Sequence, residues 1–193
     1  MPLSADHLKR SVLMAILVLS WLGSGAAWAL MESRGQSSPV LRGIFGLNLA
    51  FHPTVFVIVW KRLLTLRIAD MACLLFAAGI CATCMALRLY SPTYGASIDL
   101  QPLYLWIPVI YVFVFTLMGH RASLRISLAI LALFVSISLP YLVNPVDPSH
   151  MNFTVQMHVV SAVLIAALYF FSSYQHRFQI AQLRALAKVT QAP

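Results

Sequence analysis

The chain has 193 residues, of which 61% are apolar and 9% are charged. A soluble globular domain is about 45–50% apolar and about 25% charged, so this composition excludes an ordinary water-soluble globule. It also excludes an intrinsically disordered chain, because disorder requires low hydrophobicity and high charge. The class that remains is an integral membrane protein.

Six apolar segments of membrane length are separated by charged, polar or proline-containing stretches. They are residues 11–30, 43–60, 68–89, 102–118, 126–143 and 153–173. Each has roughly 17–22 residues, enough to cross a hydrocarbon core about 30 Å thick at a rise of about 1.5 Å per residue. The alternation expected of barrel strands is missing, so all six are predicted to be helices. The predicted fold is therefore an all-α, polytopic bundle of six transmembrane helices that forms one membrane domain over residues 1–173.

Positive charge predicts the orientation of this bundle, because cytoplasmic loops retain an excess of Lys and Arg. Most of the 13 Lys and Arg residues lie in the two tails and in the loops after the second and fourth segments. Only Arg34, Arg42 and Arg88 fall on the other side, together with Glu32, Asp99 and Asp147. Both termini are therefore predicted to be cytoplasmic. Anionic lipid beside the membrane accounts for the basic charge, so the expected partner is the bilayer and not a nucleic acid.

The N-terminus also resembles a secretory signal. Lys9 and Arg10 precede an apolar stretch that ends in Ala27-Trp28-Ala29, a small-x-small cleavage pattern. The apolar stretch is longer than a normal signal core, which favours a retained helix. Cleavage stays open, and it would leave five spans in the same orientation.

Few ionisable or amide side chains lie within or beside the predicted spans, and these are the candidates for a ligand pocket. They are Asn48, His52, His150, Gln156 and His158. If the second and sixth spans pack side by side, these residues form an outward-facing polar pocket. The interpretation that we favour is structural: a kink at His52-Pro53 in which Asn48 and His52 bind freed backbone groups. A polar ligand pocket and a haem or copper site are the alternatives, since neutral imidazole is a common metal ligand.

Other polar or small residues in the spans are predicted to be structural. Cys73, Cys81 and Cys84 all lie in the third span, where a thiolate is costly, so we expect them to pack as apolar residues. Asp70 is expected to be an interfacial acid near Arg67. The small residues Gly23, Gly25, Gly43 and Gly46 are expected to allow close helix contact. No metal and no cofactor is predicted.

Catalytic and transport motifs are missing from the sequence. It contains no Gly-x-Ser-x-Gly elbow, no Gly-rich phosphate loop and no HExxH sequence. It also lacks an inverted repeat and a pair of membrane carboxylates for ion coupling. We therefore expect no enzymatic activity from this chain alone.

The segment after the sixth span, residues 174–193, is predicted to continue as a cytoplasmic linker helix. Its apolar residues are Phe178, Ile180, Leu183, Leu186 and Ala187. Ile180, Leu183 and Ala187 have the spacing of a coiled-coil seam, with Phe178 and Leu186 beside it. A helix this short needs a partner strand or a following domain. We therefore expect a homodimer through this helix and an output domain supplied in cis or in trans.

Three stretches carry a resemblance to a known family. They are Leu89-Tyr90-Ser91-Pro92 through Leu103-Tyr104-Leu105-Trp106-Ile107-Pro108, the basic turn Gly119-His120-Arg121-Ala122-Ser123-Leu124-Arg125, and the exit helix from Tyr174 to Ala187. With the six spans, they resemble the N-terminal membrane sensor region of bacterial GGDEF-type diguanylate cyclases. The resemblance implies a multi-pass protein of the bacterial inner (plasma) membrane that takes part in signal transduction. The catalytic Gly-Gly-Asp-Glu-Phe signature is missing, so no catalytic residue is carried over.

These observations lead to three hypotheses. The leading one is a sensory or anchoring module that couples an external or membrane-borne signal to a cytoplasmic output domain such as a diguanylate cyclase. The second is a small transporter or channel with a polar pocket around His52 and His158. The third is a membrane haem or copper protein.

Overall fold

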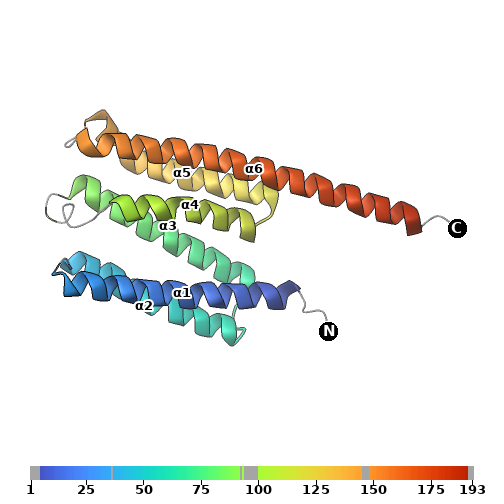
Figure 1. Ribbon diagram of the computed structural model, residues 1–193, viewed down its shortest axis with the longest axis horizontal. Coiled ribbons are helices and arrows are strands. Elements are labelled where there is room, and N and C mark those ends of the chain that lie inside the picture. The colour runs from blue at the N-terminus through green and yellow to red at the C-terminus, as the bar shows by residue number, and fades with distance from the viewer. Residues whose placement is uncertain (1–4, 36, 92, 94–99, 145–147, 191–193) are drawn as a thin grey trace. The chain divides into compact units, whose positions relative to one another are not determined.

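The computed structural model describes residues 5–35, 37–91, 93, 100–144 and 148–190, with side chains except at 5, 100–105, 148–150 and 185–190. These residues form six helices in chain order (Figure 1). The helices are α1 (Ala5–Ser33), α2 (Pro39–Trp60), α3 (Leu66–Tyr90), α4 (Leu100–Leu117), α5 (His120–Val143) and α6 (Pro148–Thr190). No strand occurs among the described residues, which confirms the predicted all-α class.

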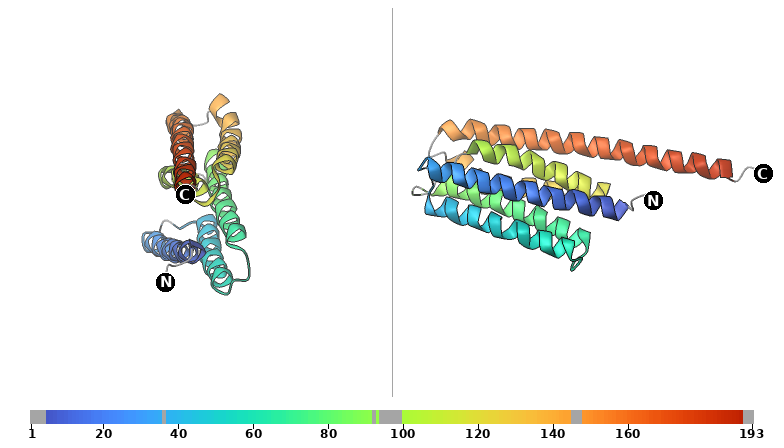
Figure 2. Two further views of the ribbon diagram at one scale, coloured as in Figure 1. Left: turned by 90° about the vertical axis from the view of Figure 1, so that its right-hand side faces the viewer. Right: turned by 60° about the horizontal axis from the view of Figure 1, so that its bottom comes forward.

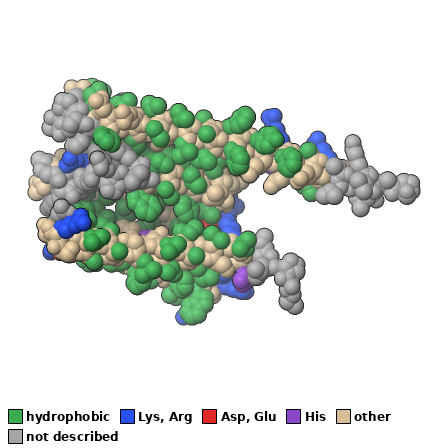
Figure 3. Space-filling model, in the orientation of Figure 1, with side chains coloured by type: hydrophobic (Ala, Val, Ile, Leu, Met, Phe, Trp, Pro, Cys, Tyr) green, Lys and Arg blue, Asp and Glu red, His purple; other side chains and the backbone are tan. Residues whose placement is uncertain are grey.

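Five of the helices are long and apolar enough to cross a membrane. The qualifying stretches are Asp6–Ser33, Pro39–Trp60, Leu66–Tyr90, His120–Val143 and Met151–Arg184. In α4 the apolar stretch with described side chains, Trp106–Leu117, is shorter than a span. Large apolar side chains lie along the outer sides of the helices in each unit (Figure 3), as expected of surfaces in contact with lipid. Five helices with the length and apolar composition of membrane spans are thus confirmed, while six spans and cytoplasmic termini stay predictions.

The chain divides into two compact units. The N-terminal unit, Met1–Leu100, contains α1, α2 and α3, and the C-terminal unit, Gln101–Pro193, contains α5, α6 and nearly all of α4. The sequence predicted a membrane domain over 1–173 and a linker over 174–193. The structure has no break at that point, because α6 is one helix of 43 residues that begins beside α5 and continues past it (Figure 2).

In the N-terminal unit, α1 lies along α2 and α2 contacts α3. The core of this unit consists of Leu13, Leu17, Val55, Val59 and Ala69. One turn before Val55 in α2, the rings of Phe51 and Phe76 stack with centroids 3.7 Å apart and planes inclined by 3°. Side chains four residues apart thus form the contact faces of α1 and α2, as expected of one face of a helix.

Among the described residues, three of the four glycines predicted to allow close helix contact lie against no neighbouring helix of their own unit. A methyl group added at Gly23, Gly43 or Gly46 would meet no atom within 4 Å. At Gly25 it would lie 3.7 Å from Cδ2 of Leu49, an ordinary contact between α1 and α2. Only Gly25 therefore lies where two described helices approach each other.

Helix α2 ends in a Schellman motif. The amide of Leu63 donates to the carbonyl of Ile58 over 3.0 Å, and the amide of Arg62 donates to that of Val59 over 3.2 Å. Arg62 occupies the left-handed position of this motif, with φ 57°, where glycine is usual. The cost of the left-handed conformation for an L residue is about 1 kcal/mol.

We expect Arg62→Gly to raise the free energy of unfolding by about 1 kcal/mol, because glycine adopts this conformation without steric cost. Unfolding in mixed micelles of increasing SDS content measures the change. Lys61→Gly is the matched control, since Lys61 is also an exposed cation but has a helical φ of −75°. Glycine there should destabilise the helix end. A stabilisation by both variants would show that the loss of charge is the cause.

Candidate functional site

The polar side chains predicted on α2 bind their own helix. The amide nitrogen Nδ2 of Asn48 donates to the carbonyl of Ile44 over 2.9 Å. Nδ1 of His52 lies 2.7 Å from the carbonyl oxygen of Asn48, and a carbonyl only accepts, so Nδ1 carries the proton. Pro53 instead deprives the carbonyl of Leu49 of its donor. The predicted repair of the freed carbonyl by these two side chains is therefore wrong.

A groove of about 210 Å³ lies between α1 and α2 beside His52. It is lined by Leu17, Val18, Trp21, His52, Pro53 and Phe56. The imidazole also has edge-to-face contacts with Phe51 and with Phe76, at centroid distances of 5.7 and 6.1 Å. No polar atom is exposed in the groove. This surface suits an apolar group, such as a lipid acyl chain, rather than a polar ligand.

The other predicted pocket residues lie on α6. His158 is half-buried and its Nε2 lies 2.6 Å from Oγ of Ser138 on α5, whereas Gln156 is exposed. Residues two positions apart in a helix differ by about 200° around its axis, so Gln156 and His158 face different sides of α6. His150 lies in the first turn of the same helix, and its side chain lies outside the described part of the chain.

Asn48 and His52 belong to the N-terminal unit, while His150, Gln156 and His158 belong to the C-terminal unit. A joint pocket of the second and sixth spans therefore stays a prediction. Within each unit, the described members of the set are not gathered around a cavity. In the part of the chain that the structure describes, no three His, Cys, Asp or Glu side chains are placed to hold a metal ion.

Ser138 and His158 form a contact that sequence reasoning missed. Ser138 has no exposed surface, and its hydroxyl also lies 3.0 Å from the carbonyl of Phe134. A serine bonded to a histidine is the beginning of a nucleophile–base pair. A substrate cannot reach a serine that is wholly buried, so the contact joins α5 to α6. Nδ1 of His158 has no hydrogen-bond partner among the described residues.

The structure also corrects the interpretation of Asp70. This residue is only 2% exposed, and its Oδ2 lies 2.8 Å from Nζ of Lys9 on α1. Neither carboxylate oxygen accepts a well-directed hydrogen bond, so the contact is an ion pair. The neighbouring Arg10 donates from Nη1 to the carbonyl of Val59 over 2.7 Å. Val59 lies in the last turn of α2, so the positive charge of Arg10 interacts favourably with the negative end of the α2 helix dipole.

Lys9 and Arg10 thus connect the start of α1 to the end of α2 and the start of α3. In the sequence, these two residues support only the predicted orientation of the helix bundle and the resemblance of the N-terminus to a secretory signal. Their partners are 61 and 49 residues away along the chain. No local pattern identifies such pairs.

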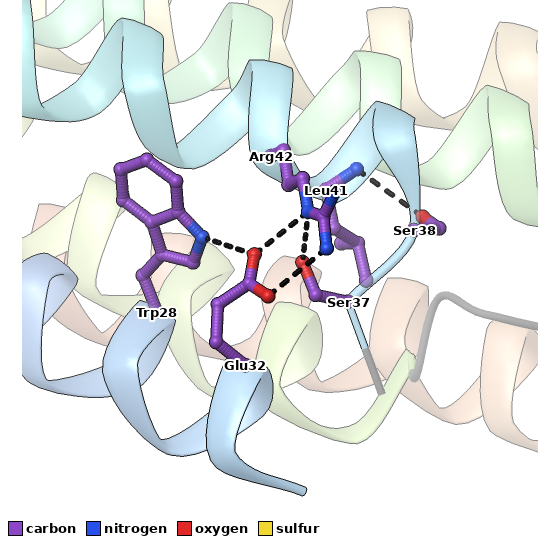
Figure 4. A network of polar contacts seen from close by, with 6 residues as sticks. All are labelled: Trp28, Glu32, Ser37, Ser38, Leu41 and Arg42. Atoms are coloured by element: carbon purple, nitrogen blue, oxygen red, sulfur yellow. Dashed lines mark hydrogen bonds and ion pairs between the residues drawn. The ribbon is translucent and has the colours of Figure 1, made fainter. Parts of the chain in front are cut away.

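A second polar network closes the turn between α1 and α2 (Figure 4). Arg42 donates to both carboxylate oxygens of Glu32, over 2.7 and 3.0 Å, and Nε1 of Trp28 donates to the same carboxylate over 3.0 Å. Ser38 caps α2 by accepting from the amide of Leu41 over 3.3 Å.

Glu32 lies beyond the predicted span 11–30, near the end of a helix longer than the hydrocarbon core. Hydrogen bonds from Arg42, Ser37 and Trp28 lower the pKa of Glu32 to about 2. Because the carboxylate stays ionised at physiological pH, this network holds the turn and does not respond to protons.

Among the described residues of the C-terminal unit, a cluster of titratable side chains surrounds His120, the first residue of α5. Its ring stacks on Tyr169, with centroids 4.6 Å apart, and on His176, with centroids 6.1 Å apart, and both angles between planes are 17°. Oγ of Ser173 lies 3.2 Å from Nε2 of His120. The spacing of Tyr169, Ser173 and His176 is a helical face and could have signalled the cluster. The sequence pattern places His120 only in a basic turn.

The exit helix continues this part of α6. Leu183 is 67% exposed and Phe178 is 54% exposed, while Ile180 is partly exposed. Residues two apart differ by about 200° around a helix, so Phe178 lies opposite Ile180 and not beside the predicted seam. Leu186 and Ala187 are helical, but their side chains lie outside the described set.

Comparison of the chain with protein families, with curated proteins and with solved structures finds no match.

Proposed function

We propose that the chain is a sensory or anchoring module of a bacterial inner membrane, with both termini in the cytoplasm. Its last helix pairs with the same helix of a second copy and transmits changes in helix packing to a cytoplasmic output domain, such as a diguanylate cyclase. One observation carries the proposal: α6 is a single helix of 43 residues. At about 1.5 Å per residue this helix is about 65 Å long, roughly twice the thickness of the hydrocarbon core.

A continuous helix transmits displacement along its length, since no flexible joint absorbs it. The first part of α6 packs along α5, with contacts from His158 to His176. The helix then continues past the first residue of α5 (Figure 1). A shift of α6 against α5 within the unit therefore moves the exit helix as well.

The apolar stripe of the exit helix, formed by Ile180 and Leu183, supports pairing. Tyr169, Ser173 and His176 face the start of α5, and Ile180 and Leu183 follow at intervals of four and three residues. These intervals keep all five residues on one face of the helix. Beyond His120, α5 no longer covers this face. A second copy related by a two-fold axis would bury the stripe in the manner of a parallel coiled coil.

Disulfide cross-linking of the full chain in native membranes tests this pairing. Cys73, Cys81 and Cys84 are first replaced by Ala, and Leu183→Cys is then introduced. We expect Leu183→Cys to yield covalent dimers on oxidation, because the coiled-coil stripe brings the two copies of residue 183 together.

Ala181→Cys is the matched control. Ala181 is exposed and lies about 160° around the helix from Leu183. We expect its dimer yield to be several-fold lower. Equal yields from the two positions, or no dimer from Leu183→Cys, would contradict the proposal.

A further inference from the structure

The contacts of His120 lie at the place where α6 leaves α5. Tyr169 and His176 are seven residues apart on α6, about 10 Å along the helix. The ring of His120 is inserted between them, at 4.6 Å from the first and 6.1 Å from the second. Ser173, midway between them on the same face, holds the edge of the imidazole at 3.2 Å. The start of α5 is thus attached to the base of the exit helix.

Two histidines in one stack are sensitive to protons, because histidine changes its charge between pH 5 and pH 8. When both imidazoles are uncharged, the rings can stack and one nitrogen of His120 can bond to Ser173. When each ring takes up a proton from solvent, two cations stand 6.1 Å apart.

Within this unit, no negatively charged side chain among the described residues offsets the charge, although the exposed His176 is in contact with solvent. The charged residues nearest in sequence are Arg121 and Arg125 on α5 and Arg177 on α6, all positive. The stretch from 112 to 119, which ends α4 and leads into α5, has no titratable side chain. The described residues of this unit contain no Asp or Glu. His120 is also the first residue of α5, where the helix dipole disfavours a cation.

We propose that His120 and His176 form a proton-operated catch that holds the base of the exit helix on α5 and releases it when both imidazoles are charged. The consequence for signalling depends on the proposed function, since the released helix is the one that would pair and carry the output domain. Ile180, the first residue of this face that α5 does not cover, follows His176 by four residues. Opening of the catch frees the helix at the start of the apolar stripe.

The distance between the start of α5 and the exit helix tests the catch directly. Nitroxide labels are attached at Ala122→Cys and Phe178→Cys, both exposed, in the full chain without its native cysteines. The protein is diluted with excess unlabelled protein and placed in nanodiscs of neutral phosphatidylcholine. Pulsed electron paramagnetic resonance then gives the distance distribution at pH 8 and at pH 5. We expect one narrow distribution at pH 8 and a longer, broader one at pH 5.

His176→Phe and His120→Phe are the matched variants, because phenylalanine keeps an aromatic ring in the stack and cannot be protonated. Both should keep the narrow distribution at pH 5. The catch is overturned if the wild-type distribution is the same at both pH values. It is equally overturned if the distribution of both variants at pH 5 is as broad as that of the wild type.

Leu183→Cys cross-linking at the same two pH values separates this inference from the proposed function. A pH-dependent distance without dimers would leave the catch standing and refute pairing. Dimers without a pH-dependent distance would support pairing and refute the catch.

Discussion

We expect Lys9→Met to lower the free energy of unfolding by roughly 2 kcal/mol, because it leaves the buried carboxylate of Asp70 without its counter-ion. Removal of one partner from a fully buried pair costs about 3–5 kcal/mol. The side chain of Lys9 is 37% exposed, so solvent already screens the pair and the expected cost is smaller. Unfolding in mixed micelles of increasing SDS content measures it.

The partners of this ion pair should respond unequally. Asp70→Asn removes the buried charge and leaves Lys9 partly in solvent, so it should cost less than Lys9→Met. The double variant should recover most of the loss, since no unpaired buried charge remains. Arg67→Met is the control: Arg67 is exposed and close to Asp70 in sequence. If Arg67→Met lowered the free energy of unfolding as much as Lys9→Met, the cause would be the loss of any positive charge near the membrane and not the loss of the ion pair.

The second large effect is expected in the core of the N-terminal unit. Leu17 on α1 is 3% exposed and packs with Val55 and Val59 of α2. Leu17→Ala should lower the free energy of unfolding by about 2–3 kcal/mol, because it leaves a cavity between the helices. The expected value lies at the low end of the range for soluble proteins, since lipid is as apolar as leucine and the lost term is mainly packing.

Leu19→Ala is the matched control on the same helix, because Leu19 is 68% exposed. We expect a change of only a few tenths of a kcal/mol, as for surface substitutions in general. The same SDS titration measures both variants. Equal losses from Leu17→Ala and Leu19→Ala would mean that α1 does not pack on α2 through this face.

The helical architecture followed from the sequence because its cause is local. Apolar runs of membrane length force backbone hydrogen bonds within each segment, and the start of α2 is further marked by Ser38 and Pro39. The extension of α6 was predictable for the same reason, since residues 174–190 contain no glycine or proline. The left-handed Arg62 at the end of α2 was not, because arginine has no preference for that conformation.

The candidate sites depended on contacts that no local pattern contains. His52 and His158 attracted attention as ionisable residues inside apolar spans, but His52 binds its own helix and His158 binds Ser138. Asp70 was expected at an interface, whereas a lysine 61 residues away makes its burial tolerable. The stack on His120 brings together residues from two helices, and the spacing of Tyr169 and His176 on α6 does not reveal that His120 is their partner.

The sequence by itself therefore determined the all-α class of this protein, the approximate positions of its helices and the continuation of its last helix beyond residue 173. Each of these depends on composition and on hydrogen bonding within one segment. Only the tertiary structure decided which polar groups are partnered, with Asp70 paired to Lys9 and His120 set between Tyr169 and His176. Such pairings depend on which helix faces meet, and lipid gives no preference among apolar faces that the sequence alone would reveal.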